Sequence, residues 1–272
     1  MLNTHEWTHE RILVLGMTYP HYSQKYQENV CTGAILASTG EMIRIHPIPR
    51  RYMDVKIKGF QWITAKISKH PHDPRPESCR VDPDSIELHE DIPSSKPAER
   101  RALLEASPHF VASYEELKSR YDERQTSLGI IRPKEITGLR LQKRSSAERE
   151  EWASTEKKML AQRDLFDRAP LPIDFPEVRF MVRWLCNDLR CQGHEMGMEE
   201  WGLHELYRKY RAKPDCESKV LEAMRRRLDH ERRDIFLFLG NFRTIMYNFG
   251  LMSSYEAPKT MAAPQLNLLG AP

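Results

Sequence analysis

Five short segments with strand-like patterns follow one another in the first ninety residues, and no strong helical pattern separates them. They occupy residues 11–17, 29–37, 42–48, 61–70 and 85–89. Successive side chains of a strand point to opposite faces, so Arg44 and His46 would share one face while Ile43 and Ile45 share the other. Many short strands joined by turns are typical of a small β-barrel, of the SH3 or OB type.

Helical patterns begin after this region. Ser113-x-x-Glu116 and Ser145-x-x-Glu148 are capping boxes, in which a hydroxyl and a carboxylate bond the first free backbone N–H groups of a helix. A short strand-like piece lies between them at 136–141. The proline-rich stretch 169–176 is the clearest candidate for a domain boundary.

Strand-like patterns return after the prolines, at 177–186, 234–240 and 244–252, with two amphipathic helices before the last pair. We therefore predict an α+β protein of two small OB-like β-barrels that are bridged and decorated by helices. The predicted divisions are an N-terminal OB-like barrel over 1–95, a helical bridging region over 96–168, a C-terminal OB-like barrel with a Cys/His loop and a helical insertion over 169–255, and a tail over 256–272.

Composition excludes several classes of protein. Hydrophobic residues make up 40% of the 272 residues, which is enough for a packed core. No stretch approaches the ~20 apolar residues that span a bilayer, and the N-terminus lacks the pattern of a signal peptide. The five cysteines are sparse and odd in number, which favours reduced thiols. We expect a cytoplasmic protein that does not enter a membrane.

The charge is unevenly distributed, although the net value is only +3. The segment from Arg208 to Arg233 contains ten Lys or Arg residues but only five Asp or Glu residues, and it includes the run Arg225, Arg226 and Arg227. Basic charge on one face is typical of a polyanion site. A solvated helix face is the alternative interpretation.

Two further segments combine basic and aromatic residues, the combination with which proteins hold phosphates and stack bases. One is the exit of the strand at 42–48, and the other is the loop between the first two strands. Their candidate nucleic-acid contacts are Arg44, His46, Arg50, Arg51 and Tyr52 in the first, and Tyr19, Tyr22, Lys25 and Tyr26 in the second. Trp62 is a further candidate for stacking. The alternatives are a solvated edge strand and a loop whose tyrosines cover the end of the barrel.

The loop Asp73-Pro-Arg-Pro-Glu-Ser78 places Asp73, Arg75 and Glu77 along one face, because its two prolines keep the chain extended. We favour an internal clamp in which the carboxylates hold Arg75. The alternative is a metal or phosphate site that uses the two carboxylates.

Cys186, Cys191 and His194 lie within nine residues and are candidates for three of the four ligands of a tetrahedral zinc ion. The fourth would come from Cys216, His204 or Glu195. The interpretation that we favour is two partly buried thiols beside a hydrogen-bonded histidine.

Several fragments, in this order, resemble the dual OB-containing domain family of prokaryotic proteins. They are TYPHYSQKYQENVCTGAI, GEMIRIHPIPRRY, DPRPES, SLGIIRPKEI, QRDLF, CQGHEMGMEEWGLHELY and FLGNF. The resemblance covers residues 11–255 and implies two OB-type barrels and a role connected with nucleic acid, in defence against mobile elements. The family pattern has Asp-Trp-Glu where this chain has Glu200-Trp201-Gly202, which weakens an acidic role at Gly202. The resemblance assigns no catalytic residue.

We therefore expect a protein that binds DNA or RNA without catalysis of its own, as a subunit of a larger nucleic-acid-processing or defence complex. Two alternatives remain open at this point. One is a metal-dependent nuclease or nucleotide-processing enzyme that uses Asp73, Glu77, His194 and Glu195. The other is a protein–protein adaptor whose barrels bind a partner subunit.

Overall fold

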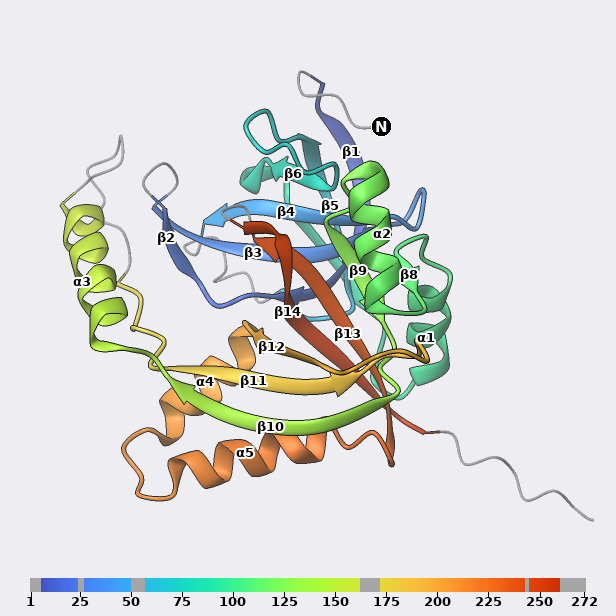
Figure 1. Ribbon diagram of the computed structural model, residues 1–272. Coiled ribbons are helices and arrows are strands. Elements are labelled where there is room, and N and C mark those ends of the chain that lie inside the picture. Colours follow the sequence, from blue (N-terminus) through green and yellow to red (C-terminus); the bar gives the residue numbers. More distant parts are fainter. Residues whose placement is uncertain (1–5, 24–26, 50–56, 162–171, 243–244, 260–272) are drawn as a thin grey trace, which may run out of the picture.

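The computed structural model describes residues 6–23, 27–49, 57–161, 172–242 and 245–259. Within these residues the chain forms two seven-stranded sheets, one from each half of the chain (Figure 1). No helix in the described residues is long and apolar enough to cross a membrane.

The first sheet closes into a five-stranded barrel. Its strands are β1 (Thr8–Met17), β3 (Gln27–Leu36), β4 (Met42–Pro49), β6 (Ser78–Val81) and β5 (Gln61–Lys69), in that order around the barrel. β5 pairs with β1 to complete the circuit, and β4 and β6 are parallel while the other neighbours are antiparallel. Two short strands extend it, since β2 (His21–Ser23) pairs with β3 and β7 (Glu87–Asp91) pairs with β5. A closed five-stranded barrel of this kind is OB-like, as the sequence predicts.

The second sheet repeats the order of the first. Its strands are β10 (Glu135–Lys143), β11 (Val178–Leu185), β12 (His194–Met198), β14 (Ile245–Pro258), β13 (Arg233–Phe242), β9 (Leu128–Ile131) and β8 (Phe110–Val111). β12 and β14 are parallel, as are β4 and β6 in the first barrel. In the described residues no pairing closes β13 onto β10, because β9 occupies that edge of β13 instead. The second unit is therefore an open barrel with the strand order of the first.

Helices connect and cover the two barrels. α4 (Trp201–Tyr210) and α5 (Cys216–Arg227) join β12 to β13 and lie below the second barrel in Figure 1. α1 (Pro97–Glu105) and α2 (Tyr114–Arg124) lie between the barrels along the chain, α3 (Ser146–Leu160) lies in the connection from β10 to β11, and a short 3-10 helix (Pro83–Ser85) precedes β7. The Ser145–Glu148 capping box forms as predicted. At Ser113 only the hydroxyl half forms, because the Glu116 carboxylate accepts from the backbone N–H of Ala112.

The predicted bridging region 96–168 needs a correction. It contains not only helices but also β8, β9 and β10, and β10 is the first strand of the second barrel. The second sheet thus begins well before the proline-rich stretch 169–176 that the sequence marked as a boundary. That stretch lies inside the β10–β11 connection, and residues 162–171 are outside the described residues.

Three apolar clusters hold the molecule together. One fills the first barrel and another fills the second, and the third lies between them. Alternate residues of β1 divide between two clusters, since Ile12 and Val14 point into the first barrel while Leu13 and Leu15 join the shared cluster. This explains why β1 has a continuous apolar run: both of its faces are buried.

Candidate functional site

A cavity of about 790 Å³ lies between the two barrels. From the first barrel it receives three groups of residues, which come from the β1–β3 connection that contains β2, from β3 and β4, and from the β5–β6 loop. They are Thr18, His21 and Tyr22, then Cys31, Arg44 and His46, then His70, Asp73 and Arg75. The cavity therefore lies on one face and two loops of the closed barrel.

The second barrel contributes mostly equivalent elements. Arg144 follows its first strand β10, Arg179 lies on β11, and Glu199 follows β12. Asn241 and Phe242 end β13 beside the turn into β14. Both barrels thus contribute the region after their first strand, their second strand and the end of their fourth strand, while β4 of the first barrel and β14 of the second have no counterpart in the lining.

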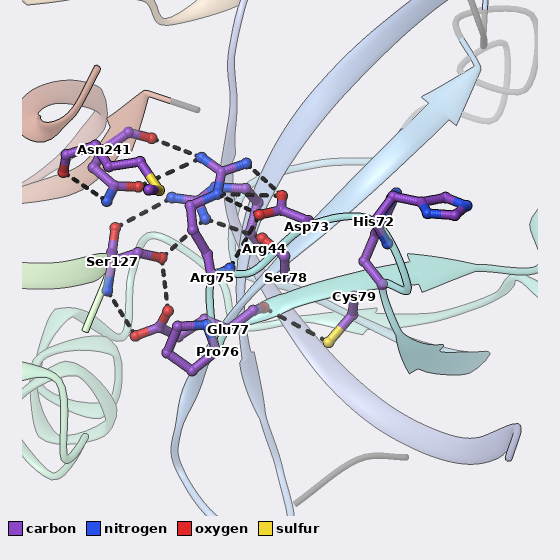
Figure 2. Close-up of polar contacts among 12 residues, drawn as sticks. Arg44, His72, Asp73, Arg75, Pro76, Glu77, Ser78, Cys79, Ser127 and Asn241 are labelled. Carbon is purple, nitrogen blue, oxygen red and sulfur yellow. Dashed lines mark hydrogen bonds and ion pairs between the residues drawn. The ribbon is translucent and has the colours of Figure 1, made fainter. Parts of the chain in front are cut away.

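Arg75 lines this cavity, and its hydrogen bonds fix the β5–β6 loop (Figure 2). Its Nε and Nη2 donate to the Asp73 carboxylate at 2.9 and 2.6 Å, and its Nη1 donates to the Asn241 carbonyl at 2.9 Å. Burial alone would raise the pKa of Asp73, but the hydrogen bonds and charge of Arg75 hold that pKa well below its usual range. The predicted Arg75–Asp73 clamp is present, and it also ties the first barrel to β13 of the second.

Glu77 does not belong to this clamp, contrary to the sequence-based expectation. Its carboxylate accepts hydrogen bonds from the backbone N–H and the hydroxyl of Ser127, at 2.9 and 2.6 Å. Arg44 bonds the same serine, with its Nη1 3.0 Å from the Ser127 hydroxyl and its Nη2 3.2 Å from the Ser127 carbonyl (Figure 2). Arg44 is only 2% exposed, and this burial lowers its pKa. Arg44 therefore belongs to a buried network rather than to an open basic surface.

The cavity is lined by four arginines and two carboxylates, Asp73 and Glu199. Arg179 and Arg144 share the Glu148 carboxylate, with Nη to Oε1 distances of 2.6 and 3.2 Å. His46 adds no positive charge at neutral pH, because burial and the neighbouring His70 lower the pKa of His46 to about 4. The lining has two more arginines than carboxylates. Glu148 and Glu77, which approach the arginines from outside the lining, balance that excess.

Two shallower hollows continue the cavity on either side. One, of about 270 Å³, shares His21, Tyr22 and Arg144 with it and adds Trp152 and Phe175. The other, of about 520 Å³, runs over β11 and β12 and shares Phe242 with the cavity. The Phe242 residue is 44% exposed, and its ring lies over Gly250, where an added Cβ would lie 2.7 Å from it. The three hollows form a path that has aromatic rings along it.

The predicted tyrosines lie near this path but are engaged in the fold. Tyr19 is buried, donates its hydroxyl to the Asp174 carbonyl at 2.9 Å and packs its ring on His204. The Tyr22 hydroxyl donates to Glu156 at 2.6 Å and accepts from the backbone N–H of Ile173. Trp62 lies outside the path, beneath the guanidinium of Arg11. The predicted contacts Lys25, Tyr26, Arg50, Arg51 and Tyr52 lie outside the described residues.

The basic run on α5 lies apart from the cavity. Arg225 and Arg226 are exposed, on a helix that packs against α4 and β10. Arg227 is held by Glu200 at 2.9 Å and Glu256 at 3.1 Å. Burial alone would lower the pKa of Arg227, but the two carboxylates raise it. Within the described residues, no side chain of α5 lines the cavity that Arg44 and His46 of β4 line, and α5 and β4 lie on opposite sides of the molecule in Figure 1.

The residues of the nuclease alternative are not brought together. Asp73 and Glu77 are engaged by Arg75 and Ser127, and Glu195 pairs with Arg140 at 2.9 Å on the second barrel. His194 instead joins Cys186 and Cys191, together with Glu115 of α2, in a cluster whose ligand atoms all lie within 4.8 Å of one another. Cys216, His204 and Glu195, the sequence-based choices for a fourth member, are not in it.

Sequence reasoning missed Arg144, Arg179, Asn241 and Phe242. A signal existed for Arg179, since it lies on the polar face of the strand whose apolar face carries Val178 and Phe180. No comparable signal marks Asn241 or Phe242, because only the approach of the first barrel turns the end of β13 into a cavity wall.

The comparisons with solved structures find distant likenesses. The chain is similar to a chain of a Replication Protein A heterotrimer bound to ssDNA, with 10% identity and a TM-score of 0.38, over 95% of this chain and 51% of that one. It is also similar to p202 HIN1 in complex with 12-mer dsDNA, with 12% identity and a TM-score of 0.29, over 72% of this chain and 94% of that one. The chain thus spans about half the length of the Replication Protein A chain.

No curated protein matches the chain. Two family descriptions do match it, one for each half. Residues 8–106 match Domain of unknown function (DUF8758), which covers the closed barrel, and residues 110–270 match Domain of unknown function (DUF8757), which begins at β8. The second match spans more than half of the sequence, so the chain belongs to the family described as Domain of unknown function (DUF8757), preceded by a DUF8758 domain.

Proposed function

We propose that this protein binds nucleic acid and that a single strand lies in the cavity between the two barrels. One observation carries the proposal: two OB-like barrels converge on one cavity, which four arginines line. OB-type barrels bind oligonucleotides and oligosaccharides on the face of their second and third strands and on the loops after the first and fourth strands.

The lining residues of the first barrel occupy those positions. β3 and β4 are its second and third strands, and they carry Cys31, Arg44 and His46. The loop after its first strand carries His21, and the loop after its fourth strand, β5, carries Arg75. The four arginines of the lining favour a polyanion over a neutral sugar if a phosphate replaces a carboxylate that now pairs with one of them, such as Glu148 beside Arg179.

The roles of individual residues follow from their exposure and partners. Arg179 keeps one-third of its side chain exposed and has Glu148 as a partner that a phosphate could replace. Phe242 offers an exposed ring on which a base can stack, and such stacking contributes roughly 1–3 kcal/mol per base. Arg44 and Arg75 are buried and each makes several hydrogen bonds, so we expect them to hold the shape of the cavity and not to contact the strand directly.

The test is a titration of labelled single-stranded DNA and RNA oligonucleotides, followed by fluorescence anisotropy at several salt concentrations. On a single strand the slope of log affinity against log salt is about 0.7 for each phosphate contacted, so Arg179→Ala should lower the slope by about that amount. Phe242→Ala should weaken binding by roughly 1–3 kcal/mol and leave the slope unchanged.

The matched control removes arginine charge elsewhere. Arg225→Ala with Arg226→Ala deletes two exposed arginines of α5 and should leave affinity and salt slope nearly unchanged. The proposal fails if the parent protein binds no oligonucleotide. It also fails if the α5 pair weakens binding while Arg179→Ala and Phe242→Ala do not.

The finer parts of this proposal rest on the sequence. The resemblance to the dual OB-containing domain family supports a role as a subunit of a larger nucleic-acid-processing or defence complex in the cytoplasm. Lys25, Tyr26, Arg50, Arg51 and Tyr52 stay predicted contacts, since each follows in sequence a strand whose residues line the cavity. Parallel titrations with duplex DNA and duplex RNA identify the preferred strand and sugar.

A further inference from the structure

A cluster of four metal-ligating side chains lies outside the cavity, between α2 and the second barrel. Cys186 directly follows β11, Cys191 lies after the next turn, His194 begins β12, and Glu115 comes from the first turn of α2. We infer that these four residues bind a zinc ion that fastens α2 to the β11–β12 edge of the second barrel.

The distances between the ligand atoms fit a tetrahedral site. Zinc–sulfur distances of about 2.3 Å and zinc–nitrogen or zinc–oxygen distances of about 2.0–2.1 Å place neighbouring ligand atoms roughly 3.3–3.8 Å apart. The Nε2 of His194 is 3.2 Å from the Cys191 sulfur, 3.5 Å from the Cys186 sulfur and 3.6 Å from a Glu115 oxygen. The other Glu115 oxygen is 3.0 Å from the Cys186 sulfur. Only small shifts would centre an ion among these atoms.

The turn that carries Cys191 is shaped to hold a thiolate. Backbone N–H groups of Cys186 and Gly193 both point at the Cys191 sulfur, at 3.4 Å. Gly193 has a φ of 96°, a conformation that other residues rarely adopt, and this brings its N–H and the following His194 onto the same side as Cys191. Two N–H groups aimed at one sulfur stabilise its negative charge, which a metal-bound thiolate retains.

The histidine is held in place by aromatic rings. Its ring centre lies 4.7 Å from that of Tyr114 and 4.6 Å from that of Trp184. Cys186 is 1% exposed and the His194 side chain 12%, whereas the Glu115 side chain is 42% exposed. Three ligands are thus protected and fixed, and the carboxylate closes the site from the solvent side.

The donor set favours zinc over other metals. Thiolates select zinc, copper(I) or iron–sulfur clusters, while imidazole and carboxylate oxygen in a tetrahedral arrangement favour zinc among these. On binding, the Cys186 and Cys191 thiols release two protons to solvent, and neutral His194 and ionised Glu115 coordinate directly.

The experiment uses the full chain, purified under reducing conditions and incubated with zinc before removal of unbound metal. Elemental analysis should give about one zinc per chain. The protein loaded with cobalt(II) should show the visible bands of tetrahedral cobalt together with a thiolate-to-cobalt charge-transfer band. Both readouts are independent of nucleic-acid binding, so the zinc site and the proposed function stand or fall separately.

Variants identify the ligands. Cys191→Ser should abolish stoichiometric zinc and the charge-transfer band. Glu115→Gln leaves three ligands, as in many zinc sites with a bound water, and should retain zinc with an affinity at least about tenfold lower, since loss even of an outer partner costs that much. Cys216→Ser, which removes a buried thiol outside the cluster, is the matched control and should bind zinc like the parent.

Three results would overturn the inference. The first is a parent chain that takes up no zinc while its thiols are titratable. The second is a disulfide between Cys186 and Cys191 in the protein prepared under reducing conditions. The third is a loss of zinc in Cys216→Ser as large as that in Cys191→Ser, which would place the metal elsewhere. If Cys191→Ser fails to fold, the zinc affinity of Glu115→Gln is compared with that of the parent by competition with a chelator. An affinity equal to that of the parent would exclude Glu115 as a ligand.

Discussion

At the scale of single residues, Gly16 of β1 shows how tightly the barrels meet. A Cβ added at Gly16 would lie 2.0 Å from the Ser253 hydroxyl oxygen and 2.7 Å from the Ser253 Cβ, on β14 of the other barrel. The Ser253 hydroxyl can rotate away, but its Cβ is fixed to the backbone, so a strand must shift. We expect Gly16→Ala to lower the free energy of unfolding by about 1–3 kcal/mol, measured by denaturant titration.

A second glycine supplies the control. A Cβ at Gly33 of β3 would meet the Met252 methyl carbon at 3.4 Å, which is ordinary contact with a flexible side chain. Gly33→Ala should therefore change stability little, and Ser253→Gly combined with Gly16→Ala should recover part of the loss. Equal effects of the two single substitutions would show that strand conformation, not the contact between barrels, sets the cost.

At the scale of elements, the β5–β6 loop is fastened to both barrels by one side chain. Arg75→Ala removes the bonds to Asp73 and to the Asn241 carbonyl, and it leaves the buried Asp73 carboxylate without its cation. Breaking a buried pair in this way costs about 3–5 kcal/mol. We expect a lower free energy of unfolding by that order, larger than any loss of oligonucleotide affinity at low salt.

Arg11 is the matched control, because it also pairs with a carboxylate, Glu90, but at the surface. Its side chain is 51% exposed and that of Glu90 67%. Exposed pairs contribute about 0–1 kcal/mol, so Arg11→Ala should unfold almost like the parent. An Arg75→Ala variant with parental stability and no oligonucleotide binding would make Arg75 a contact residue instead of a clamp.

The same loop shows what local sequence can predict about an element. The chain turns at residues 75–78, where the Ser78 N–H donates to the Arg75 carbonyl at 3.1 Å, instead of staying extended as expected. The pairing of Asp73 with Arg75 nevertheless follows from neighbouring residues alone. The partner of Glu77 does not, because Ser127 lies fifty positions away and reaches it only when the second sheet forms. On β4 the alternation of residues is likewise predicted correctly. The burial of Arg44 is not, since the face expected to be solvated is covered by the other barrel.

At the scale of the whole molecule, the two-barrel architecture follows from the sequence but the division of the chain does not. The alternating strand pattern of each half can be recognised in the sequence because each barrel has an apolar interior. β10, by contrast, has no fully buried residue, so its pattern gives only a weak strand signal, and the predicted second barrel starts at residue 169 although β10 begins at Glu135. The apolar runs of β1 and β13 carry the missing information: strands buried on both faces need a second layer.

That shared layer predicts how the molecule unfolds. Phe236 and Phe238 of β13 point away from the interior of their own barrel and pack with Leu13 and Leu15 of β1 in the cluster between the barrels. Neither barrel can keep this face buried alone, so the two should unfold in one cooperative transition.

Phe238→Ala tests this coupling, because it removes a fully buried ring from the shared cluster and should cost about 3–5 kcal/mol. Hydrogen exchange of backbone amides can follow both barrels at once, with β3 reporting on the first and β11 on the second. We expect the slowest amides of both strands to lose protection by the same factor, because both exchange through one global opening. Faster exchange confined to β11 would instead make each barrel an independent folding unit, and the cavity between them a gap that can open without unfolding either side.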